Sequence, residues 1–141
     1  MTISLVGVAD QLTKWVTSFG FTATQMLFAL IVFYLILGMF MDVLSMQVAT
    51  IPITYPIVTA LGVDPIWYGI YIVLMCELGM ITPPVGMNLF VLVAITNGEV
   101  SLARAAQASL PFWLLMLVGV AILTLAPDIA LVLPNLVMGG P

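Results

Sequence analysis

Residues 65–97 read PIWYGIYIVLMCELGMITPPVGMNLFVLVAITN, and this stretch decides the fold. As one unbroken helix it would be about 50 Å long, because each residue adds roughly 1.5 Å. The hydrocarbon core of a bilayer is about 30 Å thick, so the stretch is too long for one crossing and too short for two crossings with a turn. Pro83 and Pro84 lack backbone N–H groups, and Gly86 follows them closely. We therefore expect two half-helices that make a single crossing and meet at a non-helical loop.

The composition of the whole chain indicates that its solvent is lipid. Of 141 residues, 64% are apolar and 6% are charged, with two basic and six acidic side chains and a net charge of −4. Soluble domains have about 25% charged residues. Two cations cannot neutralise a run of phosphates, so nucleic acid is excluded as a partner. Because the chain has no His and one Cys, it offers no activated nucleophile and no imidazole or thiolate metal site, and we expect no enzyme.

The expected loop is informative because its backbone lies at membrane depth. The prolines leave helical carbonyls without N–H partners, and each unpaired carbonyl costs on the order of several kcal/mol in hydrocarbon. Broken helices of this kind are the best sequence sign of a substrate or ion site in secondary transporters. The alternative is a kinked structural helix whose carbonyls are satisfied by neighbouring side chains. We favour the binding site.

A second break lies upstream, at Gly38–Asp42. It divides residues 23–62 into two apolar segments, of which the second contains Pro52 and Pro56. The segments either cross the membrane separately or form a re-entrant helical hairpin that enters and leaves on one side. We prefer the hairpin, with its tip near 38–42, because it brings the tip to the depth of the loop at 82–86.

The remaining segments complete an all-α integral membrane protein. The expected segments are an amphipathic interfacial arm helix at 1–22, the hairpin at 23–62, the broken transmembrane helix at 63–98, a short amphipathic loop helix at 99–107, a full transmembrane helix at 108–127 and a C-terminal tail at 128–141. Four aromatic residues lie near the expected helix ends, as aromatic anchors at a membrane surface do: Trp15, Trp67, Tyr68 and Trp113.

Two acidic residues lie in sequence that we expect inside the membrane, where an ionisable side chain is a functional candidate by default. Asp42 suits either a cation ligand or an N-cap for the helix that follows. Glu77 precedes the loop by about one and a half turns and suits either a hydrogen-bonded packing residue or a group that coordinates an ion.

Five motifs occur along the chain: LGMFMD (37–42), IPITYPI (51–57), LGVDPIWYGI (61–70), ELGMITPPVGMNLFV (77–91) and LPFWLL (110–115). In this order and spacing they resemble the large membrane subunit of tripartite ATP-independent periplasmic (TRAP) transporters. The combination of LGxDPxxxG with GxxTPPxGxNLF is specific. The resemblance implies the second inverted repeat of an elevator-type, sodium-driven secondary transporter, which takes up organic acids such as C4-dicarboxylates or sialic acid.

The resemblance also implies a site in which the hairpin tip and the broken-helix loop jointly cage a sodium ion, largely through backbone carbonyls. The side chains of Thr82 and Asn88 would be available to sodium or substrate. The residues implied are Gly38, Met39, Phe40, Asp42, Thr82, Pro83, Gly86, Met87 and Asn88, with Glu77 as a further intramembrane acid. Sodium is the coupling ion, and we expect no other cofactor.

The implied partners are a small TRAP membrane subunit, a periplasmic substrate-binding protein, the N-terminal repeat of the large subunit and the lipid of a bacterial inner membrane. The family's large subunit is much longer, and only its C-terminal third resembles this chain. We therefore expect a fragment, a truncated product or one piece of a split subunit, which alone transports nothing. Two alternatives stay open: a non-transporting structural or assembly subunit, and a dual-topology homodimer, which the balance of Lys14 against Arg104 permits.

Overall fold

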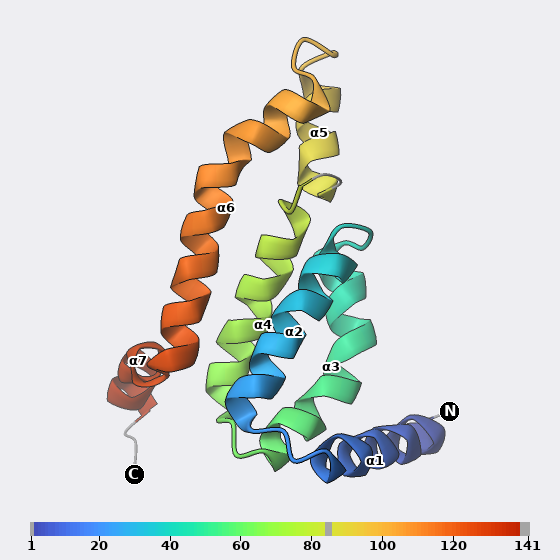
Figure 1. The fold of residues 1–141 in the computed structure, drawn as a ribbon, viewed down its shortest axis with the longest axis vertical. Helices are drawn as coiled ribbons and strands as arrows, with labels where there is room; N and C mark the ends of the chain where they lie inside the picture. Colours follow the sequence, from blue (N-terminus) through green and yellow to red (C-terminus); the bar gives the residue numbers. More distant parts are fainter. Residues whose placement is uncertain (1, 84–85, 139–141) are drawn as a thin grey trace.

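The computed structural model describes residues 2–83 and 86–138, and these form helices joined by short turns (Figure 1). The helices are α1 (Thr2–Ser18), α2 (Ala23–Gly38), α3 (Val43–Ala60), α4 (Pro65–Met80), α5 (Met87–Ile95), α6 (Leu102–Leu125) and α7 (Asp128–Met138). Within this described part of the chain there is no strand. The expected all-α class is confirmed.

The helices begin where the sequence supplies a cap. At the start of α3, Asp42 Oδ2 accepts the backbone N–H of Ser45 at 3.1 Å. At the start of α4, Asp64 Oδ1 accepts two backbone N–H groups at 2.8 and 3.0 Å. Pro65 follows at the first helical position, where its missing N–H is least costly. These caps separate α2 from α3 and α3 from α4.

The helices are arranged around α4. Helices α4 and α5 follow one another end to end, and α6 runs beside both in the opposite direction (Figure 1). Helices α2 and α3 form a helical hairpin that packs against α4. The open end of the hairpin lies near α1 and α7, whereas its tip reaches the level at which α4 gives way to α5 (Figure 1). The fold thus brings the two breaks of the sequence to one level.

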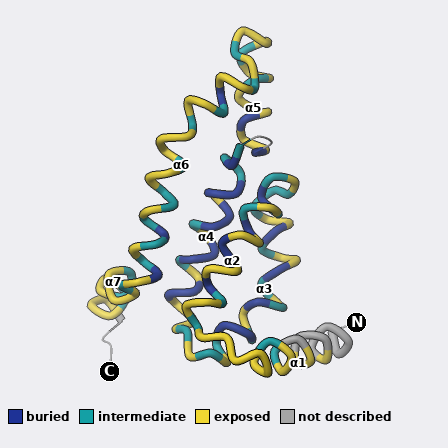
Figure 2. Tube along the Cα trace, viewed as in Figure 1, coloured by how far each residue is buried: buried dark blue, intermediate teal, exposed yellow. Residues whose placement is uncertain are grey.

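The core lies between α2, α3 and α4 (Figure 2). Its largest fully buried side chains are Tyr34, Met46, Val58, Tyr68, Tyr71, Met75 and Leu78. Helix α6 is apolar, and its residues are exposed or half-buried along most of its length (Figure 2). Helices α3 and α6 are long and apolar enough to cross a membrane. Such an apolar outer surface fits a helical membrane protein.

Two segments differ from the expectation. Helix α6 runs without interruption from Leu102 to Leu125, so no separate short helix forms at 99–107. The reason is local: the Ser101 hydroxyl accepts the N–H of Arg104 at 3.4 Å, and the alanine-rich turns that follow favour a helix. The region expected to be a tail contains α7, because its apolar side chains pack beside the core.

The aromatic residues of α4 are also placed differently from the expectation. Trp67 and Tyr68 are only 3% and 2% exposed, so they are core residues and not surface anchors. Trp67 stacks on Tyr71 with ring centroids 5.3 Å apart.

 Trp15 and Phe19, at the end of the arm, are 62% and 58% exposed. Their rings meet edge to face with centroids 4.7 Å apart. Helix α1 packs against α3. The interfacial position of this arm stays a prediction.

Candidate functional site

A glycine–glycine contact joins the hairpin tip to the broken helix. A Cβ added to Gly38 would lie 2.5 Å from Cα of Gly79, and a Cβ added to Gly79 would lie 2.8 Å from the carbonyl oxygen of Tyr34. Real Cβ atoms essentially never approach other atoms within 3.0 Å. Helices α2 and α4 therefore meet backbone to backbone in their last turns. This contact sets the hairpin tip directly beside the start of the break.

The junction gathers the ends of several helices. Helix α2 ends at Gly38 and α4 ends at Met80, so two helix C-termini with their partial negative charge lie side by side. Helices α3 and α5 begin a few residues later, at Val43 and Met87. The C-terminal ends favour a cation, and the N-terminal ends favour an anion.

Thr82 begins the break itself and is buried. Its N–H donates to the carbonyl of Gly79 at 3.1 Å, and its own carbonyl accepts the N–H of Gly86 at 3.0 Å. Its hydroxyl donates to the carbonyl of Leu78 at 2.7 Å. Thr82 thereby closes the last turn of α4 and opens the turn that leads to α5.

Gly86 lets the backbone before α5 pass close to the end of α4. A Cβ added there would lie 2.6 Å from the carbonyl oxygen of Met80, so no larger residue fits without moving backbone. Helix α5 then starts at Met87 without any side-chain cap. The second proline of the motif and the residue after it, Pro84 and Val85, lie outside the described residues.

Helix α6 contributes a residue that the sequence did not point to. The indole Nε1 of Trp113 donates to Oγ1 of Thr82 at 3.0 Å. Trp113 was expected to be a surface anchor, but it is half-buried beside the core and faces the break. The Thr82 hydroxyl, expected to be available to sodium or substrate, therefore already has two partners.

The other residues expected at the site are distributed unevenly. Buried ones are Gly38, Thr82 and Gly86; half-buried ones are Met39, Asp42 and Pro83; exposed ones are Phe40, Glu77, Met87 and Asn88. Across residues 2–83 and 86–138, no group of three or more His, Cys, Asp or Glu side chains lies together. A cation at the junction would therefore have to rely mainly on backbone oxygens.

A buried cluster of hydroxyl groups supports the hairpin below its tip. Tyr34 of α2 donates to Thr50 of α3 at 2.8 Å, and the hydroxyl of Tyr68 on α4 bonds to that of Thr54. The two threonines donate their own protons to carbonyls one turn back in α3, at 2.7 and 2.9 Å. The cluster links three helices. Sequence reasoning missed it, although Thr50 and Thr54 share one helix face.

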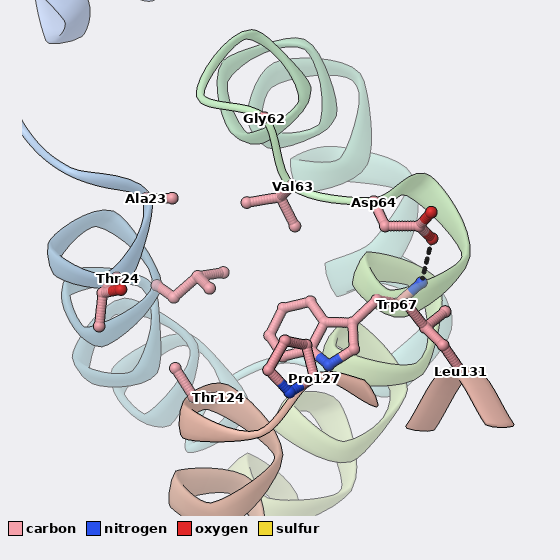
Figure 3. A pocket seen from close by; sticks show the side chains of 10 residues that line it. Ala23, Thr24, Gly62, Val63, Asp64, Trp67, Thr124, Pro127 and Leu131 are labelled. Carbon is pink, nitrogen blue, oxygen red and sulfur yellow. Dashed lines mark hydrogen bonds between the residues drawn. The ribbon is translucent and has the colours of Figure 1, made fainter. Parts of the chain in front are cut away.

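A cavity of about 260 Å³ lies at the other end of the bundle (Figure 3). It is lined by Ala23, Thr24, Leu27, Gly62, Val63, Asp64, Trp67, Thr124, Pro127 and Leu131. The carboxylate of Asp64 is engaged in capping α4, as the dashed bond in Figure 3 shows. This cavity is separate from the junction of the two breaks.

Comparison with known proteins decides the family. Residues 1–129 match the family described as "Tripartite ATP-independent periplasmic transporter, DctM component". The chain belongs to this family. It is therefore a membrane protein related to transporter permeases.

Individual TRAP relatives agree with this assignment. The chain is 38% identical over 128 residues to the C4-dicarboxylate TRAP transporter large permease protein DctM of Pseudomonas aeruginosa, which covers 91% of the chain and 30% of the relative. It is 34% identical over 117 residues to the sialic acid TRAP transporter permease protein SiaT of Haemophilus influenzae, covering 83% of the chain and 18% of the relative. The chain thus spans less than a third of the length of these relatives.

Proposed function

We propose that this chain is part of the large membrane subunit of a sodium-driven TRAP transporter that takes up organic acids across a bacterial inner membrane. The observation that carries the proposal is the contact between Gly38 and Gly79. It joins two interrupted helical elements at one level, and interrupted helices that meet within a membrane protein are where secondary transporters bind ions and substrates.

Sodium is the cation that suits the junction. The C-terminal ends of α2 and α4 lie together there and present a concentration of partial negative charge without a cluster of acidic side chains. Unwound carbonyls and half-helix C-termini are the ligands that transporters use for sodium. The ion would be held between the turn at Gly38–Asp42 and residues 79–83, where the break begins.

A carboxylate suits the start of α5. The N-terminus of α3 is already neutralised by its cap, Asp42, whereas α5 has no side-chain cap. The first N–H groups of α5 and the exposed side chain of Asn88 are therefore the donors for an organic acid. The relatives' names point to C4-dicarboxylates or sialic acid as the class of substrate.

The hairpin is proposed to be re-entrant. Helices α2 and α3 have 16 and 18 residues, against 24 in α6. At roughly 1.5 Å per residue the hairpin is about 25 Å deep, while α6 is about 36 Å long. Since the hairpin tip stops at the level of the break (Figure 1), both of its ends would lie on the same side of the membrane.

The proposed partners are the small TRAP membrane subunit, a periplasmic substrate-binding protein and further large-subunit sequence. Exposed apolar side chains along α6, such as Leu115 at 73% and Leu125 at 72%, provide surface for protein or lipid. The chain matches 30% of the Pseudomonas aeruginosa relative, and the rest of that relative corresponds to the proposed further large-subunit sequence.

Uptake by a chimeric permease tests the proposal. In this chimera, residues 1–129 replace the matching segment of the Pseudomonas aeruginosa relative, and that organism's partner proteins are co-expressed. We expect uptake of a C4-dicarboxylate to require sodium and not potassium, and Gly86→Ala to abolish it because the added Cβ meets the carbonyl of Met80. The control is Gly119→Ala, whose Cβ would meet nothing within 4 Å. Equal uptake with both cations would overturn the proposal.

A further inference from the structure

The side chain of Trp113 links α6 to the break between α4 and α5. Its Nε1 donates to Oγ1 of Thr82 at 3.0 Å, and that Oγ1 donates to the carbonyl of Leu78 at 2.7 Å. This hydrogen bond joins α6 to the break that follows α4. Helix α6 also lies beside both half-helices, α4 and α5 (Figure 1), so it can hold them in position relative to each other.

The two bonds determine how Thr82 presents its hydroxyl. A threonine hydroxyl has one proton and two lone pairs. The proton is directed to Leu78 and one lone pair accepts the indole N–H, so a single lone pair remains. Both partners restrict rotation of the Thr82 side chain, and the direction of the remaining lone pair is restricted with it.

The link continues to the hairpin tip. The backbone N–H of Thr82 donates to the carbonyl of Gly79 at 3.1 Å, and Gly79 touches Gly38. A continuous series of contacts therefore runs from Trp113 through Thr82 and Gly79 to the end of α2. A shift of α6 relative to α4 would alter the turn that the proposed sodium site uses.

We infer that Trp113 is a positioning residue for sodium binding, which acts through the Thr82 hydroxyl and holds residues 79–82 in the geometry that binds the ion. This inference rests on the proposed function. Trp113 itself is not a ligand, because its indole nitrogen is a donor only. Its effect is on the affinity for sodium and not on recognition of the organic acid.

Substitution of Trp113 by Phe in the chimeric permease tests the inference. Phe keeps an aromatic ring beside the core but removes the N–H donor. Loss of one such hydrogen bond is expected to raise the sodium concentration for half-maximal uptake about three- to tenfold. The half-saturating concentration of the C4-dicarboxylate at saturating sodium should stay unchanged. An unchanged sodium requirement in Trp113→Phe would overturn the inference.

Trp67→Phe is the matched control. Trp67 is buried and stacked on Tyr71, far from the break, so its loss tests the general cost of removing a core indole. We expect Trp67→Phe to lower the melting temperature without changing the sodium requirement. If both variants change the sodium requirement equally, Trp113 has only a structural role and the inference fails.

Variants of Thr82 keep or remove the acceptor of the same hydrogen bond. They keep the inference testable if Trp113→Phe does not insert into the membrane. Thr82→Ser keeps the hydroxyl and should resemble the wild type. Thr82→Val removes it and should raise the sodium requirement, and adding Trp113→Phe to Thr82→Val should have little further effect. Equal behaviour of the Ser and Val variants, or additive effects in the double variant, would contradict the inference.

The same measurements separate this inference from the proposed function. If uptake by the unsubstituted chimera does not depend on sodium, the proposed function fails. If uptake depends on sodium and Trp113→Phe leaves the half-saturating sodium concentration unchanged, only the role of Trp113 fails.

Discussion

Gly38 and Gly79 touch backbone to backbone in the last turns of α2 and α4, with space for a Cβ at neither position. Two helices can approach this closely only where both lack side chains. The approach brings two helix C-termini together, and their partial negative charges repel each other unless a cation or a donor lies nearby. The contact therefore determines both the shape and the electrostatics of the candidate site.

Gly38→Ala is expected to destabilise the fold by about 1–3 kcal/mol, because the added methyl group meets backbone that cannot move aside easily. The matched control is Gly69→Ala, at an exposed position of α4 with nothing within 4 Å of the added Cβ. Denaturant unfolding in detergent micelles, followed by circular dichroism, measures both. Equal stability of the two variants would show that α2 and α4 do not meet backbone to backbone at Gly38 and Gly79.

Asp42→Asn is expected to leave stability and sodium dependence almost unchanged. The carboxylate of Asp42 accepts the N–H of Ser45, and an asparagine side chain provides an equivalent N-cap. Asp42→Ala should lose about 1 kcal/mol of stability, since the cap is removed. Uptake by the chimera and unfolding of the purified protein measure the two effects. Loss of sodium dependence in Asp42→Asn would mean that the charge itself binds the ion.

Tyr34→Phe is expected to cost about 1 kcal/mol, because the Tyr34 hydroxyl is fully buried and donates to Thr50. Tyr55→Phe is the control, since Tyr55 is 42% exposed on α3. The two variants are compared by thermal unfolding. A loss of stability in Tyr55→Phe as large as that in Tyr34→Phe would argue against the buried hydroxyl cluster as a support of the hairpin.

The sequence predicted the features that depend on local chemistry. Pro83 and Gly86 close together favour a break in a helix, and Asp42 and Asp64 are strong N-caps. The turn after α2, the turn before α4 and the break before α5 could be located from these residues. The family followed from the same motifs.

Contacts between distant segments could not be predicted in this way. Nothing near Gly38 in the sequence shows that it meets Gly79, and nothing near Trp113 shows that it faces Thr82. Apolar residues occur on all sides of α4, so its pattern does not distinguish Trp67 and Tyr68 in the core from anchors at a surface. A boundary was expected between the segments 99–107 and 108–127, but α6 continues through it from Leu102 to Leu125.

Sodium binding is measured most directly by the melting temperature of the purified chimeric permease in sodium chloride and in potassium chloride at equal ionic strength. Binding of an ion to the folded state alone raises this temperature as the ion concentration rises. We expect the melting temperature to rise with sodium and not with potassium, and we expect Gly86→Ala to lose the sodium effect. The same response to both salts would contradict a sodium site between the hairpin tip and the broken helix.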